Sequence, residues 1–96
     1  MTVDDLEATA KAGREPAGLT APLTALWHDA AGDWAEAHRT AQDIDDETGA
    51  WIHAYLHRKE GDLSNADYWY RRAGRTRPAG TLDAEWRAIV SALLKG

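Results

Sequence analysis

The chain has 96 residues and no cysteine, which excludes disulfide bonds, thiolate metal ligands and thiol nucleophiles. It contains no apolar run of the ~18 residues that are needed to span a membrane, and its acidic N-terminus lacks the basic and apolar regions of a secretory signal. No segment rich in Val, Ile or Thr alternates with polar residues, so no strand is predicted. We therefore expect a cytoplasmic, all-α protein that is stabilised by packing alone.

Basic residues are outnumbered, and the formal net charge is −5. A general nucleic-acid binder needs a basic surface to neutralise phosphates, so we expect neither nucleic acid nor a membrane as a partner. Acidic residues nevertheless gather at one predicted joint and arginines at another. These residues are Asp43, Asp45, Asp46 and Glu47, and Arg71, Arg72, Arg75 and Arg77. Solvated helix ends, with acids opening one helix and bases closing the next, account for both groups.

Two stretches of the chain repeat each other at an offset of 29 residues, so that Gly32 aligns with Gly61 and Ala37 with Ala66. Each stretch contains a helix, a Gly-Asp turn and a second helix. A repeated helical hairpin is typical of folds whose units must stack to bury their apolar faces. The repeat predicts architecture and leaves function open, because helical repeats carry many unrelated functions.

The apolar spacing and the capping residues predict up to six helices. They are expected at about residues 3–12, 20–32, 33–44, 46–61, 62–74 and 81–95. Gly49 indicates that the regular part of the fourth helix begins at Ala50. Residues 1–18 are expected to be weakly helical or disordered, because Gly13 and the Glu15-Pro16 step follow the first segment at once.

Residues 19–96 are predicted to form a single domain of two hairpins, about 20–45 and 46–74, with a C-terminal capping helix at about 81–95. This last helix carries too many apolar residues to face solvent on all sides. It either caps the core or forms a homodimer, and we expect some self-association.

The second hairpin carries a recognisable set of positions, which are Ala54, Gly61-Asp62-Leu63, Ala66, Tyr70, Ala73 and Pro78. In this set the chain resembles a tetratricopeptide repeat. The resemblance implies antiparallel hairpins stacked in a right-handed superhelix. Two features depart from that family: the spacing is 29 residues rather than ~34, and Trp51 lies one place later than the usual aromatic residue.

The string from Trp51 to Gly74 also resembles a family of short bacterial proteins of uncharacterised function. It covers a quarter of the chain. This second resemblance implies no activity.

If the tetratricopeptide resemblance holds, Trp51, Tyr55, Arg58 and Lys59 fall on positions that line the concave groove of that family. There, aromatic and basic residues hold an extended peptide, often through its carboxylate, for which an arginine provides a matching fork. The leading hypothesis is therefore a protein–protein interaction module that binds a peptide or a partner helix. Alternatively, Trp51 and Tyr55 belong to the core, since a domain this small needs its aromatic residues inside.

His53 and His57 lie four residues apart in a predicted helix, a spacing at which two imidazoles can bind one metal ion. The zinc-protease motif has the same spacing but requires Glu after the first His, where this chain has Ala54. A non-catalytic metal site would need a third ligand, either Glu60 or an acid from another helix. We expect instead a buried His that is hydrogen-bonded to a carboxylate or a main-chain carbonyl, and we predict no metal and no cofactor.

A second hypothesis is a small enzyme or ligand-binding protein that uses a polar face. His57, Glu60, Asn65, Tyr68 and Arg72 could converge across the Gly-Asp turn and offer acid, base and anion-holding groups. A hydrogen-bonded layer that fixes how two helices dock is the alternative. No catalytic motif is present, so we assign no catalytic residue. The residues that would act in an enzyme are His53, His57, Asn65 and Tyr68. A third hypothesis is a structural subunit of an oligomer.

Overall fold

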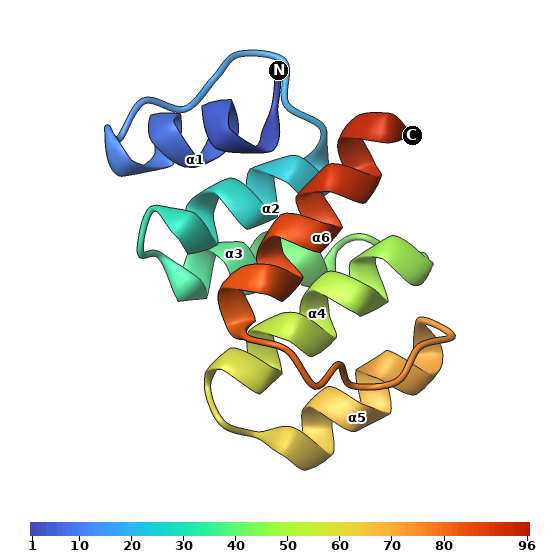
Figure 1. Ribbon diagram of the computed structural model, residues 1–96. Helices are drawn as coiled ribbons and strands as arrows, with labels where there is room; N and C mark the ends of the chain where they lie inside the picture. The colour runs from blue at the N-terminus through green and yellow to red at the C-terminus, as the bar shows by residue number, and fades with distance from the viewer.

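The computed structural model of the protein describes all 96 residues and contains six α-helices and no strand. The helices are α1 (Val3–Lys11), α2 (Ala21–Ala30), α3 (Trp34–Gln42), α4 (Glu47–Lys59), α5 (Leu63–Arg72) and α6 (Leu82–Lys95) (Figure 1). The predicted all-α fold class is confirmed. None of the six helices is both long enough and apolar enough to cross a membrane.

Capping side chains fix where most of the helices begin. The side chains of Thr2, Asp33, Asp46, Asp62 and Thr81 each accept a hydrogen bond from a main-chain N–H in the first turn of the helix that follows. Such caps satisfy donors that an isolated helix end leaves unpaired, and each contributes ~1 kcal/mol to stability. The sequence therefore sets most helix starts locally, before any tertiary contact.

The two Gly-Asp turns build the two hairpins, α2–α3 and α4–α5. Gly32 and Gly61 have φ values of +90° and +88°, a left-handed conformation that ends one helix and that other residues adopt at a cost. The aspartate after each glycine then caps the next helix. Within each hairpin the helices pack closely, and α3 packs against α4 between the hairpins. This arrangement is consistent with the predicted stack of hairpins.

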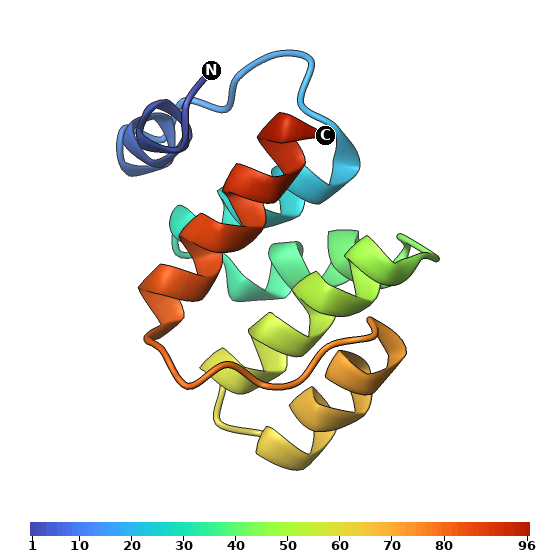
Figure 2. The ribbon, with the colours of Figure 1, turned by 45° about the vertical axis from the view of Figure 1, so that its right-hand side comes forward.

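Helix α6 lies across both hairpins, against α2 and α4 (Figure 1, Figure 2). It buries Trp86, Ile89 and Val90 in a core that also contains Leu26 and Ile52. Trp86 Nε1 donates a hydrogen bond to the carbonyl oxygen of Leu26 at 2.9 Å, which ties α6 to α2. The apolar face that led us to expect a homodimer is thus largely buried within the chain.

The N-terminal segment forms an ordered helix, α1, at the end of the molecule opposite α5 (Figure 2). Leu6 is fully buried in the core, Trp27 Nε1 donates to Thr9 Oγ1 at 3.1 Å, and Arg87 pairs with Asp4 at 2.6 Å. Of the two states expected for residues 1–18, the helical one is found. The contacts that hold α1 come from α2 and α6, distant in sequence.

Helix α4 begins at Glu47, so the prediction that its regular part begins at Ala50 is wrong. Gly49 lies inside the helix, in close contact with the turn that precedes it. A Cβ atom at Gly49 would overlap the carbonyl oxygen of Ile44 and lie 2.8 Å from its Cβ. The glycine is required by this close approach and does not interrupt the helix.

We expect Gly49→Ala to destabilise the protein by about 1–3 kcal/mol, the usual cost of overpacking. In an open helix the same change would stabilise by roughly 0.5–1 kcal/mol, so the sign of the effect is diagnostic. Urea unfolding measures it, and Gly80→Ala, where the added Cβ meets nothing closer than 3.9 Å, is the control. A Gly49→Ala variant as stable as the natural chain would contradict the close approach.

Candidate functional site

One side of α4 faces α6 and carries the residues that we expected to line a peptide groove. Tyr55 is buried, and its hydroxyl donates to Asp29 Oδ2 of α2 at 2.7 Å. Lys59 Nζ lies 2.8 Å from Asp29 Oδ1. The ring of Trp51 is half-buried, with the guanidinium of Arg75 3.4 Å from its centroid. These side chains already have partners within the chain.

Arg58 completes this side of α4 by contacting the buried carboxylate of Glu85 in α6. Arg58 Nη1 lies 2.9 Å from Glu85 Oε1, and Arg58 also donates to the carbonyl oxygen of Gly80. The hydroxyl of Tyr70 lies 2.7 Å from both carboxylate oxygens, and Trp51 Nε1 donates at 3.3 Å. Burial and the adjacent carboxylate raise the pKa of the Tyr70 hydroxyl, so it stays a donor.

The four residues expected to line an open groove, Trp51, Tyr55, Arg58 and Lys59, thus have partners within the chain: Tyr55 is buried, whereas Trp51 is half-buried and Lys59 is 40% exposed. That they bind a peptide stays a prediction. The carboxylate that the arginine was expected to take from a partner comes from Glu85 of the same chain. The physical reason is that α6 buries its apolar face against this side of α4. Glu85, the one buried acid of α6, then lies beside the donors of Trp51 and Arg58. The sequence could not show where α6 would pack.

We expect Arg58→Glu to destabilise the fold by at least about 3 kcal/mol, because it removes the partner of a buried carboxylate and adds a like charge. Guanidinium unfolding measures the loss. Arg71→Glu, at an exposed position, is the control and should change stability by less than about 0.5 kcal/mol. Equal stability of the two variants would mean that the Arg58 pair is not buried in solution.

The opposite side of α4 presents a cluster of imidazoles, which we call the histidine triad: His38 of α3, and His53 and His57 of α4. One ring nitrogen of each lies within 4.8 Å of one ring nitrogen of the other two. The Nε2 atoms of His38 and His53 are only 3.0 Å apart. His53 and His57 are each 7% exposed. The triad therefore joins the two hairpins at a largely buried point.

Two tryptophans hold the rings of the triad in place. Trp34 stacks on His38 with ring centroids 4.9 Å apart, and Trp69 stacks on His53 at 4.0 Å. His53 and His57 are themselves stacked at 4.8 Å. Each ring has flat contacts that restrict its rotation, so the nitrogens are aimed at one another by packing as well as by hydrogen bonding.

Contacts at both ring nitrogens orient His57. Nδ1 lies 2.6 Å from Glu60 Oε1, one turn later in the chain, which confirms the expectation of a buried His bonded to a carboxylate. Nε2 lies 3.4 Å from the side-chain amide nitrogen of Asn65, in the first turn of α5. The carboxylate on Nδ1 favours the tautomer with its proton there and leaves Nε2 with a free lone pair.

Two members of the triad, His38 and His53, are held neutral. Burial lowers the pKa of His53 to about 4, and the neighbouring His38 and His57 add to the shift, because a proton on one ring disfavours a proton on the next. Burial is also the main reason why the pKa of His38 is lowered, with His57 contributing and Glu60 opposing. At neutral pH both rings carry lone pairs that can bind a proton donor or a metal ion.

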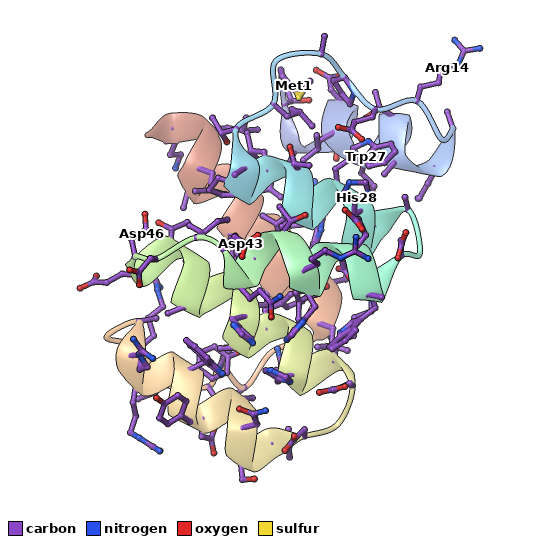
Figure 3. The ribbon with its side chains drawn as sticks, turned by 180° about the vertical axis from the view of Figure 1, so that it is seen from behind. Met1, Arg14, Trp27, His28, Asp43 and Asp46 are labelled. Atoms are coloured by element: carbon purple, nitrogen blue, oxygen red, sulfur yellow. The ribbon has the colours of Figure 1, made fainter.

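A cavity of about 290 Å³ opens beside the triad and reaches His53. Its wall includes Trp69 and Arg72 from α5 and the acidic joint between α3 and α4, which Asp43 and Asp46 mark in Figure 3. The guanidinium of Arg72 lies 4.9 Å from the centroid of Trp69. The site therefore has a route to solvent on the side of His53.

Three of the four residues named for an enzyme, His53, His57 and Asn65, lie together here. The fourth, Tyr68, is 45% exposed, and its hydroxyl accepts only from Arg72. The residue that sequence reasoning missed is His38. Its signal was its place on α3, four residues after Trp34 and three residues before the buried Ala41, a spacing that puts the three residues on one side of the helix.

In the presence of a chelator that removes metal ions, we expect the free energy of unfolding to fall as the pH drops from 6.5 towards 4. In this window an unfolded His53 takes a proton that the folded state refuses, so protons favour unfolding and stability is complete only above the window. The titratable and charged groups around the ring are His38 and His57, which contact it, and Arg72, Asp45 and Asp46, which line the same cavity. Because carboxylates also titrate near its lower end, His53→Gln is compared, and its profile should be flatter. NMR titration of the His53 ring near its ordinary value would refute the expectation.

Comparisons with known protein families, with curated proteins and with solved structures found no match to this chain. The tetratricopeptide resemblance thus stays a prediction that rests on the residues of the second hairpin. What the chain does has to be argued from the geometry of the histidine triad and its surroundings.

Proposed function

We propose, in place of the expectation of no metal, that this chain is a small metal-binding protein that takes one divalent transition-metal ion on His38, His53 and His57. The observation that carries the proposal is the convergence of three ring nitrogens within 4.8 Å. Two nitrogens bound to one tetrahedral ion at ~2.0–2.1 Å lie about 3.3 Å apart. The 3.0 Å between the Nε2 atoms of His38 and His53 is close to that value, so small side-chain movements suffice.

The donor set favours particular ions. Neutral imidazoles suit Zn²⁺, Cu²⁺, Ni²⁺ and Co²⁺, whereas Ca²⁺ and Mg²⁺ take oxygen ligands. Because burial keeps the pKa of His53 and of His38 below the ordinary value, protons compete little for these nitrogens at neutral pH. The chain has no thiolate that would select for a softer ion.

The residues around the triad also support a metal site. Histidines that bind metals usually donate their other ring N–H to a carboxylate or carbonyl, which fixes the tautomer. His57 has this arrangement, with Glu60 on Nδ1. Trp34 and Trp69 restrict the other two rings, so little conformational freedom is lost when an ion binds.

A bound ion would also act on the fold, because its ligands come from both hairpins. His38 belongs to α3 and the other two ligands to α4. An ion that binds only the folded chain stabilises it, by ~2.7 kcal/mol when its concentration is 100 times the dissociation constant. The ion would thus join the two hairpins at the point where α3 packs against α4. By contrast, Tyr55 and Arg58, two of the residues on which the peptide-binding hypothesis rests, are already paired with Asp29 and Glu85 of the same chain.

We expect Zn²⁺ or Co²⁺ to bind with 1:1 stoichiometry in calorimetry, and Cu²⁺ to quench the fluorescence of the tryptophans stacked on the triad. His38→Gln should weaken binding by more than about tenfold, since even residues behind a ligand often contribute that much. The matched control is His28→Gln. His28 lies beside Trp27 on α2 (Figure 3), 3.8 Å from Glu15 and outside the triad.

Equal affinity of the His38→Gln and His28→Gln variants would place the ion elsewhere on the chain and refute the proposal. Absence of any binding to the natural chain at neutral pH would refute it as well. A rise in melting temperature with Zn²⁺ that His38→Gln abolishes and His28→Gln retains would support it independently of the fluorescence.

A further inference from the structure

We infer that Asn65 supplies the fourth ligand of this site, through its side-chain oxygen, so that the ion is held by three nitrogens and one oxygen. The inference rests on the proposed function. It names a residue of α5, the helix that also contributes Trp69 and Arg72 to the surroundings of the triad. It also predicts which substitution alters the coordination of the ion without removing a histidine.

The position of Asn65 relative to His57 is the first argument. Its amide nitrogen lies 3.4 Å from His57 Nε2, the ring nitrogen that Glu60 leaves free. Two ligands of one tetrahedral ion are separated by about 3.3 Å. The amide therefore already lies at the distance from Nε2 that a neighbouring ligand would have.

The chemistry of a carboxamide is the second argument. Its oxygen and nitrogen occupy nearly the same shape, and a half-turn about the last side-chain bond exchanges them. Without an ion, the NH₂ group faces the lone pair of His57 Nε2 and donates to it. With an ion on Nε2, a donor in that place would be repelled, whereas the turned amide presents oxygen lone pairs to the cation.

The third argument is that the neighbouring carboxylate oxygens already accept other hydrogen bonds. Glu60 is bonded to His57 Nδ1, and Asp62 caps α5 by accepting from the main-chain N–H of Asn65 at 3.3 Å. This cap also fixes the backbone of Asn65 in the first turn of α5. Asn65 is half-buried, and its side chain has no protein partner besides His57, so its oxygen is free for the ion.

A plug is the competing role for Asn65. In that role its NH₂ group blocks Nε2 and must leave before an ion binds. The two roles predict opposite signs. If Asn65 is a ligand, Asn65→Ala weakens Co²⁺ binding; if it is a plug, Asn65→Ala strengthens binding. Asn65→Asp strengthens binding in either role, because it removes the NH₂ group and adds a negatively charged oxygen ligand, so the sign of the Asn65→Ala effect decides between them.

The experiment titrates Co²⁺ into the natural chain and into Asn65→Ala, Asn65→Asp and Ser64→Ala, following calorimetric affinity and the visible absorption of the bound ion. Ser64 is the exposed neighbour of Asn65, and its variant is the matched control. We expect affinity about tenfold lower for Asn65→Ala, with a changed absorption spectrum. Affinity at least equal to that of the natural chain is expected for Asn65→Asp, and no change for Ser64→Ala.

Outcomes for the two proposals are distinguishable. If the natural chain binds Co²⁺ and His38→Gln does not, but Asn65→Ala binds as tightly as the natural chain or more tightly, the fourth ligand is refuted and the triad stands. If the natural chain binds no ion, both proposals fail. Far-ultraviolet circular dichroism of each variant confirms that the helices are intact. If Asn65→Ala unfolds, Asn65→Leu, which has nearly the shape of asparagine without its oxygen or NH₂ group, makes the same test.

Discussion

The buried carboxylate of Glu85 is the contact on which the arrangement of the helices most depends. It lies on α6 and is bonded to Arg58 and Trp51 of α4 and to Tyr70 of α5. A carboxylate that loses water without gaining donors is strongly unfavourable. Helix α6 can therefore dock only where these three donors meet, and that condition sets its position along α4. The apolar residues of α6 provide the driving force, and the carboxylate selects the register.

Because of this contact, α4 is enclosed on two sides with different chemistry. The side that carries Tyr55 and Arg58 packs on the core and on α6, where the two side chains pair with Asp29 and Glu85. The side of His53 and His57 faces α3 and α5 and keeps nitrogens whose partners are exchangeable. Charged groups on the first side are fixed by burial, so that changing them alters stability. The second side is where a ligand can bind without dismantling the fold, which is why the functional argument belongs there.

The local features were predictable because they depend on neighbouring residues. The Gly-Asp turns at Gly32 and Gly61 and the caps at Asp33 and Asp62 followed from spacing and propensity. The role of Gly49 was misjudged for the opposite reason: a glycine inside a helix reads as a break, and only the folded chain brings the carbonyl of Ile44 against it. The helix α1 was predicted, but its packing against the core was not, since its contacts come from α2 and α6.

The residues of the candidate site also differ in whether neighbouring residues alone could predict them. The pair His53 and His57 could be found because both lie on one helix at a spacing of four residues. The third imidazole, His38, lies on another helix, and its approach depends on how α3 packs against α4. Sequence periodicity places His38 on a buried face, but it cannot say which nitrogen of which ring that face will meet. A metal site assembled from two hairpins is for this reason visible only after folding.

The contacts within the histidine triad also explain how three imidazoles can lie together in a domain of this size. A neutral imidazole has one N–H and one lone pair, so the 3.0 Å contact between His38 and His53 is satisfied when one ring donates and the other accepts. No buried polar side-chain atom is left without a partner, so the triad carries no desolvation penalty for unpaired groups. An ion bound by both Nε2 atoms would require only that the donating ring carries its proton on Nδ1. Such an ion would replace a proton shared between rings that packing already holds in place, so the fold itself would supply the cost of assembling the ligands.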